Sequence, residues 1–78
     1  RRGQVIQDCI NALQEDQRVA MVLSDVQGLN YQEIAETTGA TLGTVKSRLS
    51  RARQGVRRCL QAFRELLPPE YRLMNNDE

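Results

Sequence analysis

The chain of 78 residues contains no histidine and no tryptophan, and its only aromatic residues are one phenylalanine and two tyrosines. Without histidine it lacks the commonest general base and a common metal ligand, and no nucleophile stands beside a base. A glycine-rich phosphate loop and a cluster of metal ligands are also missing from the sequence. We therefore expect no enzyme, no cofactor and no metal site. The few aromatic residues also argue against a protein that stacks unpaired bases.

Cysteine and long hydrophobic runs are scarce as well. Cys9 and Cys59 are too few for a disulfide-rich scaffold. Both occupy apolar positions of helical patterns, which predicts two buried free thiols in a reducing cytosol. No run of apolar residues approaches the length of a membrane span, and no signal peptide is visible, so we expect a cytoplasmic protein without membrane contact. The chain begins with Arg1 rather than Met, so we expect it to be a fragment of a longer protein.

Acidic residues are absent from residues 37–64, a segment with seven basic residues. Residues 1–36 carry six acidic and three basic residues, and residues 65–78 carry four acidic residues and one basic residue. The net charge of +1 therefore conceals a basic block between acidic flanks. This pattern is expected when one element of a protein contacts phosphates. The alternative is a solvated helix face in which arginine was selected for its helix propensity.

Apolar residues recur at helical spacing in four segments, which predicts an all-α domain of four helices within residues 1–67. The expected helices span about residues 4–13, 15–26, 31–38, and from 41 or 44 to 67. The apolar residues expected to face inward in the first two helices are Val5, Ile6, Cys9, Ile10, Leu13, Val19, Ala20, Val22, Leu23 and Val26. Pro68 and Pro69 end the last helix, and residues 68–78 are expected to form a polar, disordered tail.

Local signals within residues 30–53 predict a helix-turn-helix. Asn30 and Glu33 form a capping pair at the start of the third helix, and Gly39 permits the sharp turn after it. Ala35 is small enough for two helices to cross closely, and Val45 packs the second helix of the motif on the first. The last helix is expected to continue through Gly55, which weakens it by about 1 kcal/mol relative to alanine. Such a motif projects the first half of its second helix into the DNA major groove.

If the apolar residues of this recognition helix face the core, its first turns project a polar group outward. The outward residues are Lys46, Ser47, Ser50 and Arg51. Arg51 is the strongest candidate for reading a base, because arginine bonds both acceptors of a guanine edge and so discriminates by about 1–3 kcal/mol. Arg48 and Arg53 lie further round the helix and are suited to phosphate contacts. Thr41 and Thr44 have two compatible interpretations, as N-capping residues or as phosphate ligands at the helix start.

Two stretches of this segment resemble a known family. Gly-Leu-Asn-Tyr-Gln-Glu-Ile-Ala-Glu, followed by Leu-Gly-Thr-Val-Lys-Ser-Arg-Leu-Ser-Arg-Ala-Arg, is similar to region 4 of extracytoplasmic-function sigma factors of the sigma-70 family. The resemblance covers about residues 5–66. Gln14 stands where the family usually has proline, and Ala40-Thr41 stands where Cys-Pro or a similar pair is common.

The resemblance implies a function and a set of partners. Such domains read the minus-35 promoter element, dock on the flap of the β subunit of bacterial RNA polymerase core, and in many members are covered by an anti-sigma factor. Carried over by position, the base-reading candidates are Lys46, Ser47, Ser50 and Arg51. The candidates for contact with the DNA backbone are Thr41, Gly43, Thr44, Arg48 and Arg53. The family varies at the position of Ser50, so the base preference stays open.

Two other functions are compatible with the same residues. The chain could be the helix-turn-helix effector domain of a response regulator, although the Arg-Ala-Arg run favours a sigma factor. It could also be a protein-interaction module, such as the target of an anti-sigma factor. Leu60, Phe63, Leu66 and Leu67 extend beyond what a compact helix-turn-helix needs. They are expected either to cover the first helix or to remain exposed as a docking patch.

Overall fold

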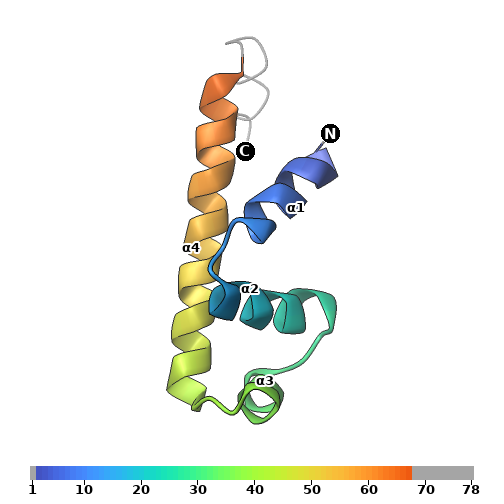
Figure 1. Ribbon diagram of the computed structural model, residues 1–78, viewed down its shortest axis with the longest axis vertical. Helices are drawn as coiled ribbons and strands as arrows, with labels where there is room; N and C mark the ends of the chain where they lie inside the picture. Colours follow the sequence, from blue (N-terminus) through green and yellow to red (C-terminus); the bar gives the residue numbers. More distant parts are fainter. Residues whose placement is uncertain (1, 68–78) are drawn as a thin grey trace.

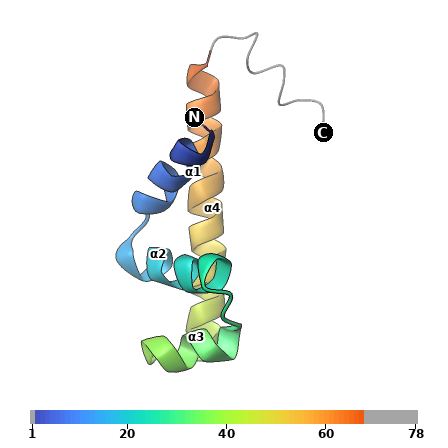
Figure 2. The same cartoon turned by 90° about the vertical axis from the view of Figure 1, so that its right-hand side faces the viewer.

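The computed structural model describes residues 2–67, and between its short connections this part of the chain is helical throughout. The helices are α1 (Arg2–Asn11), α2 (Glu15–Met21), the π-helical segment η1 (Val22–Val26), α3 (Tyr31–Thr38) and α4 (Leu42–Leu66). The three short α-helices all pack on one side of the long α4 (Figures 1 and 2). The predicted all-α, four-helix fold is thus confirmed. The expected tail, residues 68–78, lies outside the described residues.

The boundaries of α3 follow from its local sequence, as predicted. The Asn30 side chain accepts a hydrogen bond from the Glu33 backbone N–H, and the Glu33 carboxylate accepts one from the Asn30 backbone N–H, both at 2.8 Å. These reciprocal bonds satisfy two donors that a helix start otherwise leaves unpaired. At the other end Gly39 adopts a φ of 74°, a conformation in which a side chain is strained. The chain then turns directly into α4.

The core lies where α2, α3 and the first half of α4 meet. Ile34, Val45 and Leu49 are its largest fully buried side chains, each no more than 1% exposed. Ala35 and Ala52 are buried beside them, so small side chains stand where helices approach closely. This arrangement confirms the predicted roles of Ala35 and Val45. The helix-turn-helix is therefore a packed unit that fixes the orientation of α4.

The predicted inward face of the second helix was partly wrong. Val19 and Val26 are 39% and 69% exposed, whereas Met21, which was not expected inside, is buried together with Ala20. Two neighbouring apolar stripes run along this segment, one with Val19 and Val26 and the other with Met21. Apolar spacing alone does not decide which of the two packs on α3 and α4. The helix also widens to π-type hydrogen bonding over η1, where the Gln27 N–H donates to the Val22 carbonyl at 3.0 Å. The wider turn shifts the later side chains relative to an α-helical pattern.

The two cysteines do not form the expected pair of free thiols. Cys9 of α1 and Cys59 of α4 are joined by a disulfide, with their Cα atoms 5.7 Å apart. Cys9 is buried, while Cys59 is only partly so. The prediction failed because the crossing of α1 over α4 decides whether two cysteines 50 residues apart come within bonding range, and the sequence does not give that distance.

The α1 helix covers only part of the second half of α4. Its C-terminal end lies against α4 near the disulfide, and its N-terminal end diverges from α4 (Figure 1). Leu60 is half-buried, but Phe63 and Leu66 are 41% and 84% exposed. Cover by α1 ends before the end of α4, so part of the predicted apolar set is exposed, and its role as a docking patch stays a prediction. Gly55 lies within an unbroken α4, as predicted.

The disulfide yields a prediction about stability. Replacing Cys9 and Cys59 together by serine removes a covalent link that closes a long loop, so we expect the free energy of unfolding to fall by about 2–4 kcal/mol. A thermal melt followed by circular dichroism measures the change as a lower Tm. A thiol reductant should lower the Tm of the unsubstituted chain similarly and leave that of the double variant unchanged. Equal melting temperatures of the oxidised chain and the double variant would contradict the prediction.

Candidate nucleic-acid interface

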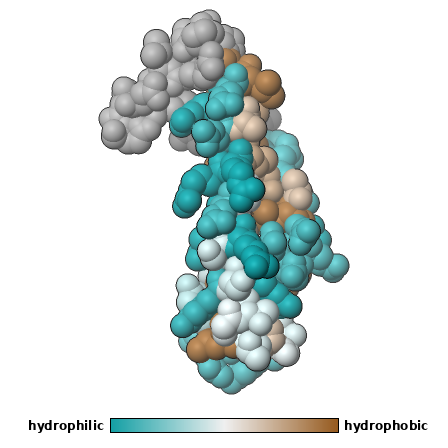
Figure 3. Space-filling model, turned by 90° about the vertical axis from the view of Figure 1, so that its left-hand side faces the viewer, coloured by the Kyte–Doolittle hydropathy of each residue, from teal (hydrophilic) through white to brown (hydrophobic). Residues whose placement is uncertain are grey.

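The first half of α4 has one face in the core and the other in solvent. Val45 and Leu49 face the core, and the predicted base-reading residues are all exposed on the other side of the helix: Lys46, Ser47, Ser50 and Arg51. The surface of α4 that points away from the three short helices is largely hydrophilic (Figure 3). The structure therefore brings these four residues together on one continuous exposed face, anchored from behind.

Hydroxyl groups and open backbone surround the first turn of α4. Thr41 is the N-cap, and its hydroxyl oxygen accepts a hydrogen bond from the Thr44 N–H at 3.2 Å. The same hydroxyl donates to the Thr44 hydroxyl oxygen at 3.0 Å. N-capping by Thr41 is thus observed, and both hydroxyls stand at the positive end of a 25-residue helix. A Cβ atom at Gly43 would meet nothing within 4 Å, so no contact within the described residues requires glycine there.

Two of the predicted phosphate-contact residues already have acidic partners. The Arg48 Nε atom lies 3.5 Å from Asp16 Oδ2 on α2, and the Arg53 Nη2 atom lies 3.2 Å from Asp25 Oδ1 on η1. All four side chains are between 31% and 50% exposed. Partly exposed pairs of this kind contribute about 0–1 kcal/mol each. They orient the two arginines along the edge of the helix-turn-helix without holding them tightly.

The surroundings of Arg53 favour its charged form. The nearby Tyr31 hydroxyl has the largest effect and raises the pKa of the guanidinium, partial burial lowers it, and Asp25 raises it further, so the net shift is upward. Arg53 thus interacts with residues of both η1 and α3. These contacts tie the middle of α4 to the two elements that precede the turn.

Sequence reasoning missed these acidic partners. Asp25 is 28 residues from Arg53 in the chain, and no local pattern links the two. Arg58 was also not among the predicted site residues, although it follows Arg51 by seven positions, a spacing that returns to the same face of a helix. This seven-residue spacing was the sequence feature that could have placed Arg58 on the same face of α4 as Arg51.

Residues 2–67 contain neither a cluster of metal ligands nor a helix that could span a membrane. No group of three or more potential metal ligands gathers in this range. None of its helices is both long and apolar enough to cross a membrane. Among these residues, the arrangement best suited to a ligand remains the exposed polar and basic face of α4.

Comparison with known proteins identifies the family. The family model for sigma-70, region 4, matches residues 3–54. The chain is 46% identical over 57 residues to the ECF RNA polymerase sigma factor SigE of Mycolicibacterium smegmatis, an alignment that covers 73% of this chain and 22% of the relative. It is 39% identical over 57 residues to the ECF RNA polymerase sigma-E factor of Haemophilus influenzae, covering 73% of this chain and 30% of that one. For the sigma-E factor of Escherichia coli K12 the identity is 42% over 53 residues, or 68% and 28% of the two chains. The chain thus spans less than a third of the length of these relatives, and it belongs to the sigma-70 region 4 family as a domain of the extracytoplasmic-function type.

Proposed function

We propose that this domain binds the minus-35 element of bacterial promoters as part of a sigma factor that directs RNA polymerase in transcription initiation. The observation that carries the proposal is the exposed face of α4 formed by Lys46, Ser47, Ser50 and Arg51, which is backed by the buried Val45 and Leu49. A helix fixed in this way presents side chains of defined direction to the major groove. The domain acts by binding and not by catalysis.

The proposed roles follow from position and charge. Arg51 and Lys46 donate hydrogen bonds to base edges, and Ser47 and Ser50 contact bases between them. Arg48 and Arg53 bind the phosphates that flank the groove. Their pairs with Asp16 and Asp25 are partly exposed, so exchanging a carboxylate for a phosphate costs little free energy. Thr41, Gly43 and Thr44 hold a further phosphate at the start of α4.

The proposed partners follow from the family. The relatives are named as RNA polymerase sigma factors, and we extend this role to the protein that contains this domain, with RNA polymerase core as partner through the β-subunit flap in the bacterial cytoplasm. An anti-sigma factor is a second proposed partner. The exposed apolar side chains of Phe63 and Leu66 provide a surface for one of these proteins. The family match gives no support to the response-regulator alternative.

Selection from a pool of random duplex DNA at low salt tests the proposal directly. We expect the chain to enrich one short motif, with an affinity that falls steeply as salt is raised, because the phosphate contacts release counterions. Sequencing of the retained DNA identifies the motif. If no DNA is retained, the proposed function is wrong. If DNA is retained without any enriched motif, the sequence-reading part of the proposal is wrong.

Substitution of Arg51 separates base reading from phosphate contact. We expect Arg51→Ala to relax the preference at one position of the selected motif, with a loss of discrimination of about 1–3 kcal/mol there. Arg57→Ala is the matched control, since it removes the same charge from an exposed position of α4 outside the predicted set. The control should weaken binding slightly and equally for all sequences. A uniform loss with Arg51→Ala would show that Arg51 contacts only phosphate.

Gly43 offers a test in which stability and binding should change in opposite directions. Alanine is the better helix former by up to about 1 kcal/mol, and a Cβ atom at this position meets nothing within 4 Å. We therefore expect Gly43→Ala to leave the Tm unchanged or higher. DNA affinity should nevertheless fall several-fold, because the added methyl group separates the backbone N–H groups from the phosphate. Unchanged affinity in a binding titration would remove Gly43 from the interface.

A further inference from the structure

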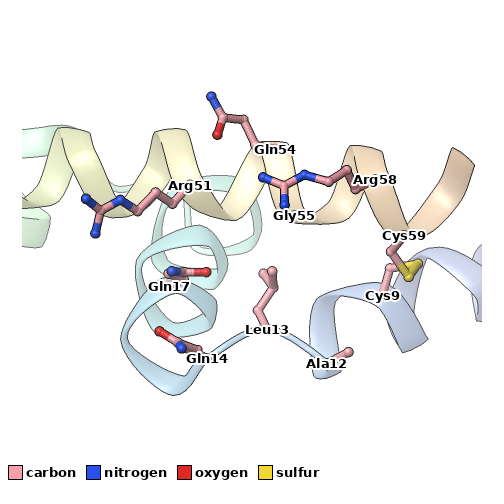
Figure 4. Close-up of a pocket in the computed structure, with 10 residues that line it drawn as sticks. All are labelled: Cys9, Ala12, Leu13, Gln14, Gln17, Arg51, Gln54, Gly55, Arg58 and Cys59. Atoms are coloured by element: carbon pink, nitrogen blue, oxygen red, sulfur yellow. A yellow bond between two sulfur atoms is a disulfide. The ribbon is translucent and has the colours of Figure 1, made fainter. Parts of the chain in front are cut away.

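A cleft of about 500 Å³ lies where the connection between α1 and α2 meets the middle of α4. Arg51, Gln54 and Arg58 of α4 line one side, and Gln14 and Gln17 at the start of α2 line the other. Figure 4 shows the Arg58 side chain running along α4 beside Gly55, with Leu13 between the two walls and the disulfide at one end. The cleft begins at Arg51, the last residue assigned to base reading, and extends from there toward the C-terminal half of α4.

The walls of the cleft suit a ligand with negatively charged oxygen atoms. Its ten lining residues include two arginines and three glutamines but no aspartate or glutamate. Within residues 2–67 the observed ion pairs involve Arg48 and Arg53 and not the two arginines of the cleft. Both cleft arginines are exposed to solvent. Guanidinium groups bind phosphate through strong charge-assisted hydrogen bonds, and carboxamide groups add neutral donors.

The walls are held in place from behind. A Cβ atom at Gly55 would lie only 2.7 Å from Leu13 Cδ2, so the absence of a side chain there lets the connection approach α4 closely. The Arg18 guanidinium donates hydrogen bonds to the carbonyl oxygens of Asn11 and Leu13 at 3.4 and 3.3 Å, which steadies the same connection. The disulfide links α1 to α4 at one end of the cleft, so the wall opposite α4 is held covalently there.

The cleft continues the stripe of α4 that begins on the base-reading face. Ser47, Arg51, Gln54 and Arg58 follow one another at intervals of four, three and four residues, which places them on one side of the helix. With a rise of about 1.5 Å per residue, Arg58 lies roughly 10 Å further along the axis than Arg51. The major groove is about 12 Å wide. If α4 crosses the groove with Arg51 at a base edge, a separation of this size places Arg58 beside the sugar-phosphate strand that borders the groove.

We propose that this cleft binds a backbone phosphate of the same DNA duplex, just outside the bases read by α4. Arg58 supplies the charge, and the carboxamides of Gln14 and Gln17 complete the site from α2. The inference rests on the proposed function and extends the DNA interface to the corner between α1 and α2. Such a contact adds affinity and fixes the register of the domain on DNA, but it carries no sequence information.

Two neighbouring arginines of α4 provide a matched test. Arg57 and Arg58 are both exposed, but only Arg58 lines the cleft. We expect Arg58→Gln to weaken binding of the chain to its selected duplex roughly tenfold at low salt. It should also make the slope of log affinity against log salt less steep by about 0.9, the value of one lost phosphate contact. Arg57→Gln should change both quantities much less, and both variants should melt like the unsubstituted chain.

A duplex series with single neutral methylphosphonates locates the phosphate. One neutral position beside the motif should weaken binding of the unsubstituted chain and of Arg57→Gln, with no further effect on Arg58→Gln. Gln17→Glu places a carboxylate in the cleft, and we expect this variant to lose affinity because the carboxylate repels the phosphate. The methylphosphonate at that same position is neutral, so it should relieve the loss.

The outcomes separate this inference from the function on which it rests. If the unsubstituted chain selects no DNA, both are overturned. If it selects a motif but Arg58→Gln behaves like Arg57→Gln, only the cleft site is wrong. The cleft site is also wrong if every methylphosphonate effect persists in Arg58→Gln.

Discussion

The packing of Ile34 of α3 against Val45 and Leu49 of α4 is the contact on which the rest of the structure depends. All three side chains are at most 1% exposed, and the buried Ala20 and Met21 of α2 extend the same cluster. Close packing of this kind resists rotation of one helix against another, because any rotation opens a void or forces a clash. The direction of every exposed side chain in the first half of α4 follows from this contact.

The α4 helix therefore does two things with one sequence. Its inner stripe supplies much of the core, and its outer stripe supplies the polar and basic surface, so the proposed binding residues are placed by the same residues that stabilise the fold. A ligand-binding face on a rigid helix needs little reordering when it binds, which reduces the entropic cost of association. The capping bonds of Thr41 and Thr44 fix the first turn, where this face begins.

Two acidic residues form ion pairs with part of the basic block, and its other cations have no such pair within residues 2–67. Asp16 and Asp25 lie beside Arg48 and Arg53 at the edges of the helix-turn-helix, where they join α4 to α2 and η1. Lys46, Arg51 and Arg58 face solvent instead. Among residues 2–67, this division leaves positive charge without an ion-pair partner along the exposed surface of α4, from Lys46 to Arg58 beside the α1–α2 connection. Charge placed in this way attracts a polyanion to one face and steers its approach.

The sequence by itself determined the elements whose signals are local. The capping pair of Asn30 and Glu33, the positive φ of Gly39 and the apolar spacing of α4 depend on neighbouring residues, so the bounds of α3 and the exposed face of α4 could be predicted. Tertiary structure decided the remainder, because it depends on distances between segments far apart in the chain. Packing of the three short helices on α4 selected Met21 over Val19 for the core, joined Cys9 to Cys59, paired Arg53 with Asp25 and brought Gln17 and Arg58 into the lining of one cleft.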